Sequence, residues 1–414
     1  MKNKIVFVIN YFYPDLASTG QLMTELCTHL TEEFDITVIA AQPSYAGEKI
    51  NVLRKITYDR YGEIKVIRIQ LPEVNKNSKI SRLRYISSYF FNALSALLKE
   101  KNIDLVFTIS QPPILGGFLG TLGKFFKRAK HVYNIQDFNP EQAAVVNYFN
   151  KQLIINWAKK ADKFNCSYSD CVIVVGNDMS QTLINRFENK NVPHHVVINN
   201  WTNEDVIIPL SKNEPDIQQF LNENRLDDKF IIMYSGNLGL YYDLENIIKI
   251  TKHFKENKNL AFVFIGEGAV KKKMQSFIGK HNISNVHFLP YQPKEFIKYS
   301  LNAADVHLVV NQKGIKGVSV PSKIYGVMAA GKPVLGVLEQ DSEAEMIISK
   351  SNCGVVVEPQ DYDGIIEQIE NLYGMEKVEL SELGYNGREY LDQHLKRKIS
   401  INKYRNTLNN VLQS

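Results

Sequence analysis

Residues 305–337 read DVHLVVNQKGIKGVSVPSKIYGVMAAGKPVLGV, and this stretch decides the fold class. It begins with a short β-branched run, passes through a loop that contains Gly314 and Gly317, and continues into a helix that opens at Pro321. The helix stops at Gly331, a proline follows, and a second apolar run closes the stretch. A strand, a helix and another strand, with both strands almost wholly apolar, are typical of a parallel sheet covered on both faces.

The same alternation continues on both sides of this stretch, where apolar runs of strand length recur with helical segments between them. We predict strands at Lys4–Asn10, Ile36–Ala40, Ile64–Ile69, Asp104–Ile109, His131–Gln136, Cys171–Val175 and His195–Ile198, and in the second half at Phe230–Ser235, Leu260–Ile265, Val286–Leu289, Asp305–Val310, Pro333–Val337 and Gly354–Val357. The polar segment Asn199–Asp216 separates the two sets. The sequence therefore predicts two doubly wound, Rossmann-like α/β domains, residues 1–200 and 201–384, whose strand ends face a ligand-binding cleft.

The composition excludes several classes of protein. The chain has 414 residues, 44% of them apolar, and a net charge of only +5, which gives no indication of nucleic-acid binding. Its four cysteines lack metal-ligand spacing, and the N-terminal apolar run is too short for a signal sequence. Leu105–Gly123 is uncharged, but prolines and a glycine pair interrupt it, so we expect a strand, a loop and a helix rather than a membrane span. We expect a cytoplasmic protein.

Three turns at strand ends of the second domain predict an anion-binding pocket. The first contains Gly236, Asn237 and Gly239, the second is Gly266-Glu267-Gly268, and the third is Pro321-Ser322-Lys323 at the helix start. Glycines let the backbone approach a ligand, and helix N–H groups joined by a lysine can hold a diphosphate. A cation in the first turn of a helix opposes the helix dipole, which favours a functional role for Lys323. Each turn alone is ordinary turn chemistry, but three on one sheet predict a nucleotide pocket.

Two candidate sites lie in the first domain. Gly20 stands near the start of a helix after the first strand, in YFYPDLASTG, and suits the approach of a phosphate. Asp137 follows a strand in HVYNIQDFNPEQ, where its carboxylate could orient or deprotonate an acceptor hydroxyl, with Glu141 one helical turn further on. The alternative is that Asp137 and Asn139 only cap the helix that begins at Pro140. No G-x-G-x-x-G or Walker loop occurs, which disfavours dinucleotide dehydrogenases and P-loop NTPases.

Basic residues are interleaved with aromatic ones in two segments of the first domain. One holds Lys76, Lys79, Arg82 and Arg84 followed by Tyr85, Tyr89, Phe90 and Phe91, and the other is Lys124–Lys130. Such a pattern on an amphipathic helix suits the surface of an anionic membrane. The alternative is a solvated helix whose aromatic side chains enter the core.

With these residues in view, nearly the whole chain resembles family-4 glycosyltransferases of the GT-B fold. The resemblance rests on YPDLASTG, SGNLG, FIGEG and, most specifically, VPSKIYGVMAAGKPVLGV. INNW at 198–201 and QDFNPE, where a D-x-x-P-E segment stands, are similar to bacterial transferases that build O-antigen, capsule and exopolysaccharide repeat units, including N-acetylfucosamine transferases.

The resemblance implies retaining transfer of a sugar, such as an N-acetylated hexosamine or deoxyhexosamine, from a UDP-sugar to a saccharide on a polyprenyl diphosphate at the inner face of the membrane. Gly236, Asn237 and the 321–323 turn would bind the diphosphate, and the 266–268 turn the base and ribose. Gly20 would reach the donor, with Asp137, Glu141 and Lys323 as catalytic residues. A terminal helical segment, Tyr385–Ser414, would cross back onto the first domain. No metal or other cofactor is expected.

The chain departs from the family pattern at two places. The Glu-x7-Glu pair usual before A-x-G-x-P is absent, because Val318 and Gly326 stand there. The Arg and Lys usual after the first glycine of the second domain are also missing, and we predict that Lys323 replaces them. The sole Asp-x-Asp, Asp361-Tyr362-Asp363, precedes a helix, so we expect capping rather than metal binding. Two rival functions remain open: a nucleotide-sugar epimerase on the same fold, or a non-catalytic subunit that binds a nucleotide sugar.

Overall fold

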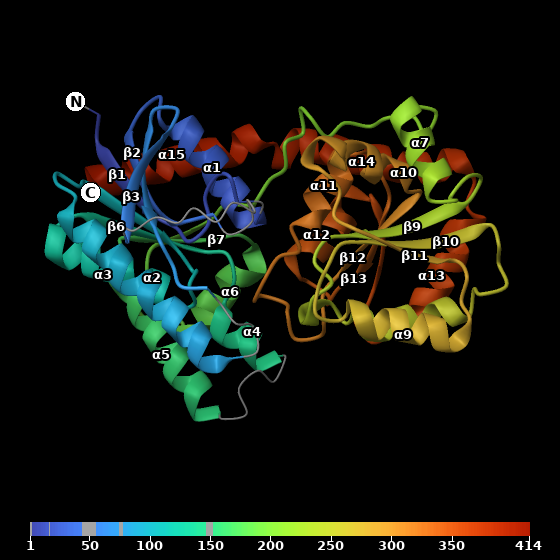
Figure 1. The fold of residues 1–414 in the computed structure, drawn as a ribbon, viewed down its shortest axis with the longest axis horizontal. Helices are drawn as coiled ribbons and strands as arrows, with labels where there is room; N and C mark the ends of the chain where they lie inside the picture. The colour runs from blue at the N-terminus through green and yellow to red at the C-terminus, as the bar shows by residue number, and fades with distance from the viewer. Residues whose placement is uncertain (1, 16, 44–54, 74–77, 146–151) are drawn as a thin grey trace. The chain divides into compact units, whose positions relative to one another are not determined.

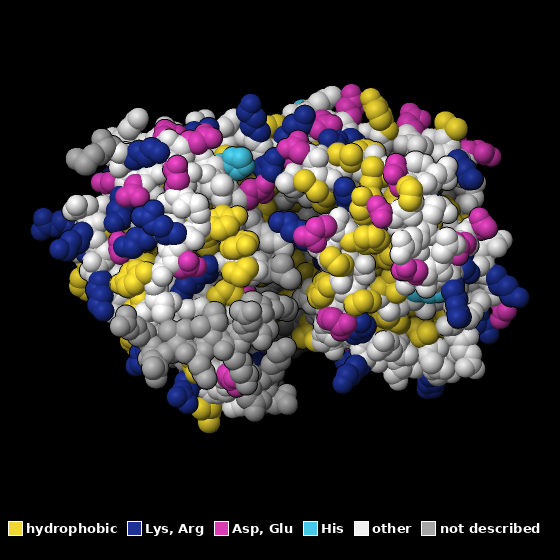
Figure 2. Space-filling view, turned by 45° about the horizontal axis from the view of Figure 1, so that its top comes forward, with side chains coloured by type: hydrophobic (Ala, Val, Ile, Leu, Met, Phe, Trp, Pro, Cys, Tyr) yellow, Lys and Arg dark blue, Asp and Glu magenta, His cyan; other side chains and the backbone are white. Residues whose placement is uncertain are grey.

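The computed structural model describes residues 2–15, 17–43, 55–73, 78–145 and 152–414. The chain forms two compact units, residues 1–199 with 401–414 and residues 200–400. Lys76 and the side chain of Lys79, which belong to the first predicted basic-aromatic segment, lie outside the described residues. On the face shown in Figure 2, acidic and basic side chains are interspersed.

The described part of the first unit contains one sheet in the order β3-β4-β2-β1-β5-β6-β7-β8. All neighbouring strands pair in parallel except β3 and β4, which form an antiparallel hairpin. The order reverses between β1 and β5, so the loops after these two strands flank the switch point at which α/β sheets bind ligands. The strands are β1 (Lys4–Val8), β2 (Asp35–Ala41), β3 (Ile56–Tyr61), β4 (Ile64–Ile69), β5 (Leu105–Ile109), β6 (Lys130–Ile135), β7 (Cys171–Val174) and β8 (His195–Val197).

Helices cover both faces of the first sheet (Figure 1). On one face, Val6, Val8 and Val106 pack with Leu97 and Leu119 of two long helices. On the other, Phe107 packs against Tyr404 of the C-terminal helix, with ring centroids 6.2 Å apart. The helices are α1 (Ser18–Leu30), α2 (Lys79–Lys99), α3 (Leu115–Lys127), α4 (Asn139–Val145), α5 (Gln152–Tyr168), α6 (Asn177–Arg186) and α15 (Arg397–Gln413).

The second unit holds a wholly parallel sheet in the order β11-β10-β9-β12-β13-β14. Counted within the unit this is the order 3-2-1-4-5-6 of a Rossmann sheet, with its switch point between β9 and β12. The strands are β9 (Phe230–Ser235), β10 (Leu260–Ile265), β11 (Val286–Leu289), β12 (Val306–Val310), β13 (Val334–Val337) and β14 (Gly354–Val357).

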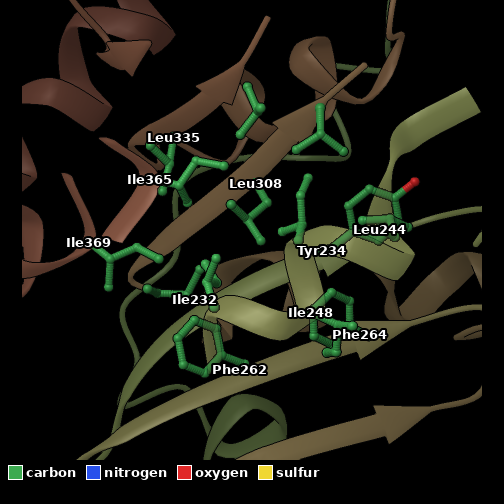
Figure 3. Close-up of a cluster of buried hydrophobic side chains, with 14 of the residues drawn as sticks. Ile232, Tyr234, Leu244, Ile248, Phe262, Phe264, Leu308, Leu335, Ile365 and Ile369 are labelled. Carbon is green, nitrogen blue, oxygen red and sulfur yellow. The ribbon is translucent and has the colours of Figure 1, made fainter. Parts of the chain in front are cut away.

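The second sheet is also covered on both faces. One face carries a buried cluster to which β9, β10, β12 and β13 all contribute, and Figure 3 shows Tyr234 and Leu308 within it. The helical elements of this unit are α7 (Pro215–Glu223), η1 (Leu240–Tyr242), α8 (Leu244–Ile247), η2 (Ile248–Lys252), α9 (Lys271–His281), η3 (Lys294–Phe296), α10 (Ile297–Ala303), α11 (Lys323–Ala329), α12 (Glu343–Ser351), α13 (Tyr362–Gly374), α14 (Lys377–Tyr390) and η4 (Leu391–Leu395).

The terminal segment differs from the prediction in where it changes units. We expected residues 385–414 to return to the first domain, but only residues 401–414 belong to the first unit. Residues before Ile401 are held by the second unit, because Leu391 and Leu395 lie in its core and Arg388 Nη1 donates to Ala329 O at 2.9 Å. From Ile401 onward the helix packs on the first sheet, where Asn134 Nδ2 donates to Tyr404 Oη at 2.6 Å. In the described part of the chain, no helix is long and apolar enough to span a bilayer.

Candidate functional site

The predicted glycine turns of the second unit pack directly against one another. Gly236 follows β9 with φ +146° and Gly266 follows β10 with φ +141°, a region of backbone conformation that favours glycine. A Cβ on Gly266 would lie 2.0 Å from the carbonyl oxygen of Gly236, so the two turns leave no room for a side chain between them. The 266–268 turn also holds the next segment, because Leu238 N donates to Glu267 O at 2.9 Å.

Lys323 reaches this pair of turns from the other side of the switch point. It is the first residue of α11, in the segment that follows β12, as predicted. A Cβ on Gly236 would lie 2.3 Å from Lys323 Cε, so the lysine stem fills the space that a side chain would need. The sequence-predicted residues Gly236, Gly266 and Lys323 are therefore brought together in one place.

The Lys323 ammonium is surrounded by aromatic rings rather than by carboxylates. Its Nζ lies 4.2 Å from the ring centroid of Tyr242 and 4.9 Å from that of Tyr234. Burial lowers the pKa of Lys323 to about 8, and no charged neighbour contributes to that shift. Among the described residues no carboxylate forms an ion pair with it. A partly buried cation in this state is suited to receive an anion from outside the protein.

The remaining members of the predicted donor site surround these turns. Asn237 is exposed, and its carbonyl accepts a hydrogen bond of 2.7 Å from Tyr234 Oη. Glu267 is exposed as well, but Lys271 Nζ lies 2.6 Å from its Oε1. This ion pair competes with the predicted contact between Glu267 and the donor. At Gly239 and Gly268, a side chain in place of the glycine hydrogen would bring its Cβ atom into contact with the side chain of Asn237. The last two predicted residues, Pro321 and Ser322, immediately precede α11.

The loop between β12 and α11 is fastened by a carboxylate. The backbone N–H groups of Gly314 and Lys316 donate to Glu339 Oε2 at 2.8 and 2.9 Å. Gly314 and Gly317 both have positive φ. The two bonds to Glu339 fix the loop to the segment after β13.

Gly20 is the third residue of α1, near the start of the helix as predicted. The helix begins at Ser18, preceded by Ala17, and no side-chain hydrogen bond caps it. A Cβ on Gly20 would lie 3.0 Å from Tyr11 Cβ, so this glycine allows the segment after β1 to pack closely on α1. Its contact with a donor phosphate stays a prediction.

Asp137 follows β6 in a corner built around Ser110, which follows β5. The backbone N–H groups of Gln136 and Asp137 donate to Ser110 Oγ, and Asn139 Nδ2 donates to Ser110 O at 2.7 Å. Ser110 and Asp137 therefore lie at the carboxyl ends of neighbouring strands. The corner fixes the backbone of the predicted acceptor-side carboxylate, and its catalytic role stays a prediction.

Glu141 forms an ion pair that was not predicted from the sequence. Its Oε1 lies 2.7 Å from Nη2 of Arg186, which is buried and also forms an ion pair with Asp162. Tyr133 Oη donates to Asp162 Oδ1 at 2.8 Å, and the Arg186 guanidinium lies 4.4 Å from the ring centroid of Phe138. This network ties α4, α5 and α6 together.

The ionisation of this network is coupled. Burial lowers the pKa of Arg186, but the Asp162 and Glu141 carboxylates raise it by more, so the guanidinium stays charged. Burial raises the pKa of Asp162 in spite of Arg186 and Tyr133. Because Arg186 engages the carboxylate of Glu141, the geometry favours a positioning role for this residue over the predicted catalytic one.

The two basic-aromatic segments differ from each other in exposure. In α2, Tyr89 is fully buried, as the alternative interpretation requires, whereas Phe91 is 67% exposed. In α3, Phe125 and Phe126 are both exposed beside Arg128. The described residues of α5 add a third such segment, in which Leu153 and Trp157 are 73% and 72% exposed and Lys160 Nζ lies 5.7 Å from the Trp157 ring centroid.

Sequence reasoning missed three residues that define these sites, namely Tyr234, Tyr242 and Arg186. Tyr234 is the one aromatic residue with a polar tip in the strand FIIMYS, and a second tyrosine eight residues later is a signal that could have found the pair. Asp361 caps α13 through a hydrogen bond from Gly364 N, as predicted. Within the described residues, no group of three His, Cys, Asp or Glu side chains is placed to hold a metal ion.

A protein-family model matches most of the second unit. Residues 216–390 match the family model "Glycosyl transferases group 1". The chain is 27% identical to the probable glycosyltransferase WbjE of Pseudomonas aeruginosa, over 97% of this chain and 96% of that protein. It is 24% identical to the putative colanic acid biosynthesis glycosyl transferase WcaI of Escherichia coli K12, over 98% and 99% of the two chains.

Solved structures share the fold at low sequence identity. A sucrose-phosphate synthase from Thermosynechococcus elongatus superposes with a TM-score of 0.77 at 15% identity, and the match covers 100% of both chains. HepE from Anabaena, solved in complex with UDP and glucose, superposes with a TM-score of 0.70 at 13% identity over 98% of this chain and 99% of that chain. These likenesses confirm the predicted GT-B fold.

Proposed function

We propose that this chain, a glycosyltransferase that carries a glycosyl transferase group 1 domain at residues 216–390, moves a sugar from a UDP-sugar to a lipid-linked saccharide. The product would extend the repeat unit of a bacterial surface polysaccharide. Two observations on relatives support this, since WcaI is named for colanic acid biosynthesis and HepE was solved with UDP and glucose. Within this chain, the chief support is Lys323, a cation at the switch point of the second sheet that forms no ion pair with any residue the structure describes.

The proposed donor site uses Lys323 and the glycine turns together. A diphosphate near Gly236 could approach the backbone of that turn closely, and Lys323 Nζ lies 3.2 Å from the position that a Cβ on Gly236 would occupy. An amino group in a water-poor site interacts with developing negative charge more strongly than it would in water. Lys323 would therefore stabilise the departing UDP, and we propose that the reaction needs no divalent metal.

The proposed reaction retains the configuration of the transferred sugar, an N-acetylated hexosamine or deoxyhexosamine. The bond between the anomeric carbon and the UDP oxygen breaks, and the acceptor oxygen forms its bond on the same face. The acceptor proton passes to the departing phosphate oxygen, so UDP leaves without the help of a protein nucleophile. Catalysis would then consist of positioning and of charge stabilisation. Asp137, held in the Ser110 corner, is the residue that we propose orients the acceptor hydroxyl.

Turnover of a lipid-linked substrate calls for contact with a membrane surface, and the first unit offers a suitable face. We define the basic-aromatic face as exposed apolar side chains of α2, α3 and α5 together with exposed cations on or next to the same helices, namely Leu83, Phe91, Phe125, Phe126, Leu153 and Trp157 with Arg82, Arg84, Arg128 and Lys160. α3 packs against both α2 and α5, so the three helices form one layer. Exposed aromatic and aliphatic side chains with flanking cations can insert into the surface of an anionic bilayer. We propose that this face places the protein on the inner surface of the cell membrane.

The function is tested by incubating purified protein with a panel of UDP- and GDP-sugars and a synthetic polyprenyl-diphosphate saccharide. We expect one UDP-sugar to raise the melting temperature and to yield an extended lipid-linked product and free UDP. The same reaction with a chelator present should proceed at the same rate. An isomerised nucleotide sugar formed without acceptor would assign an epimerase instead. If no nucleotide sugar raised the melting temperature, the result would favour a non-catalytic subunit.

The membrane contact is tested by flotation with vesicles that contain phosphatidylglycerol. Leu153→Ser with Trp157→Ser should lower the bound fraction about tenfold or more, because two exposed apolar side chains are lost to the bilayer. Val378→Ser is the matched control, since Val378 is 79% exposed on α14 of the second unit. Equal binding by both variants and the wild type would overturn the assignment of this face.

A further inference from the structure

The contact between Lys323 and two tyrosines raises a question that its proposed role leaves open. Tyr234 lies on β9 and is fully buried, with its hydroxyl donating to Asn237 O. Tyr242 ends η1 and packs on the same core cluster. The two ring centroids are 6.1 Å apart, and the ammonium lies within 5 Å of both. Two rings from separate elements thus flank one cation.

Ionised groups of the surrounding elements are engaged elsewhere. Asp243, next to Tyr242, accepts hydrogen bonds from Tyr362 Oη at 2.6 Å and from Asn246 Nδ2. Glu267, in the turn after β10, pairs with Lys271. Burial raises the pKa of Tyr234, and the neighbouring Tyr242 and Tyr291 raise it further. Lys323 itself has its pKa lowered by burial alone, which means that neither carboxylate compensates its charge.

Resting on the proposed function, we propose that Tyr234 and Tyr242 position Lys323 as an unneutralised cation for the donor diphosphate, so that the site takes up a proton when the nucleotide binds. The ring faces supply a weak attraction that holds the ammonium in place without cancelling its charge. The free site then contains Lys323 partly as the neutral amine near pH 8. The diphosphate completes the ion pair, and the amine binds one proton from solvent as the pair forms. Tyr234 and Tyr242 are positioning residues in this scheme.

Calorimetric titration of the full chain with UDP tests this scheme. With a Lys323 pKa of about 8, we expect uptake of about half a proton per UDP bound at pH 8, measured from the binding enthalpies in two buffers of different ionisation enthalpy. The Kd for UDP should rise about tenfold between pH 7 and pH 9 as the free amine forms. Lys323→Arg keeps the charge over this range, so its Kd should be independent of pH and should not be linked to proton uptake.

The tyrosines are tested by a graded pair of variants. Tyr242→Phe keeps the ring and should leave the Kd for UDP within about twofold of wild type, whereas Tyr242→Leu removes it and should weaken binding by about twofold to thirtyfold at pH 8. Thermal unfolding of both variants separates a loss of fold from a loss of positioning. If the leucine variant keeps the wild-type Kd and pH profile, the tyrosines do not position Lys323.

The outcomes also separate this inference from the proposed function. UDP that binds the wild type with no proton uptake and a Kd independent of pH would overturn the inference and leave the glycosyl transfer standing. Failure of UDP to bind the wild type at every pH would instead overturn the UDP donor on which the inference rests.

Discussion

Arg186 of the first unit and Lys323 of the second are both cations withdrawn from water, yet their surroundings are opposite. Arg186 is 6% exposed and has two carboxylates, Glu141 and Asp162, within hydrogen-bond distance. Lys323 has two tyrosine rings and, among the described residues, no carboxylate partner. Arg186 thus has two carboxylate partners, whereas no described carboxylate forms an ion pair with Lys323.

The difference teaches how to distinguish a structural cation from a binding one. Substitution of one member of a buried ion pair strongly destabilises the fold, because the remaining members are left as buried charges without a partner. A buried charge without a partner lowers the stability of the free protein, and this cost is recovered only when an anion binds. Arg186 is therefore expected to affect folding, and Lys323 to affect binding and turnover.

The largest expected effect comes from Arg186→Met. The change leaves Glu141 and Asp162 without their shared cation, which should lower the free energy of unfolding by about 3–5 kcal/mol. Urea denaturation measures this loss. Lys273→Met is the matched control, because its ion pair with Glu245 is exposed and should contribute less than about 1 kcal/mol. Equal losses in the two variants would contradict the contrast drawn here.

Lys323→Met should produce the opposite pattern. Turnover should fall by about 10²–10³-fold, because the departing diphosphate loses its stabilising cation. The fold should be retained, since methionine fills the lysine stem without burying a charge. Initial rates of UDP release measure the effect, with circular dichroism as the check on folding. Near wild-type turnover would show that the diphosphate is stabilised by another group.

Glu141→Gln distinguishes the two roles considered for that residue. If Glu141 mainly holds Arg186, the neutral amide should cost about 1–3 kcal/mol of stability and change kcat by less than about threefold. Denaturation and steady-state kinetics on the same preparation provide both values. Loss of about a hundredfold in kcat at unchanged stability would restore the catalytic role predicted from the sequence.

The smallest effect concerns stability and pH. Lys323 has a folded pKa of about 8 against an unfolded value of 10.5, so below pH 8 both states are protonated and the full cost of the buried charge is present. Between these values the unfolded chain binds more protons, and stability rises with pH. Lys323→Met should therefore be more stable than wild type at pH 7, and this difference in the free energy of unfolding should narrow toward pH 10.5. A gap that widens with pH would contradict the sign of the shift.

Much of the fold could be predicted because parallel strands are short apolar runs. Every run that we predicted as a strand lies in one of the two sheets. β3 was missed because its sequence, ITYDRY, is polar and mostly exposed, and it pairs as an antiparallel edge strand. Local hydrophobicity reveals burial on two faces, and an edge strand with one exposed face lacks that signal.

Site residues that directly follow the strands of one sheet could be predicted from the sequence, whereas contacts between residues far apart in the sequence could not. Gly236, Gly266 and Lys323 follow strands of one sheet, so topology brings them together without further information. The pairing of Glu141 with Arg186 joins residues 45 positions apart on different helices. No spacing rule in the sequence selects that partner, so the ion pair could not be predicted from the sequence, and the catalytic role of Glu141 stays a prediction.

The return of α15 to the first sheet has a consequence for synthesis of the chain on the ribosome. Tyr404, Leu408 and Val411 are buried in the finished protein, and Tyr404 contacts Phe107 and Asn134 of the first unit. The first 199 residues emerge early, but one face of their sheet lacks this cover until about 200 further residues have been translated. During this time the apolar face of the first sheet that α15 covers in the finished protein is exposed to solvent. We expect chaperones to bind a stalled or truncated chain through this face.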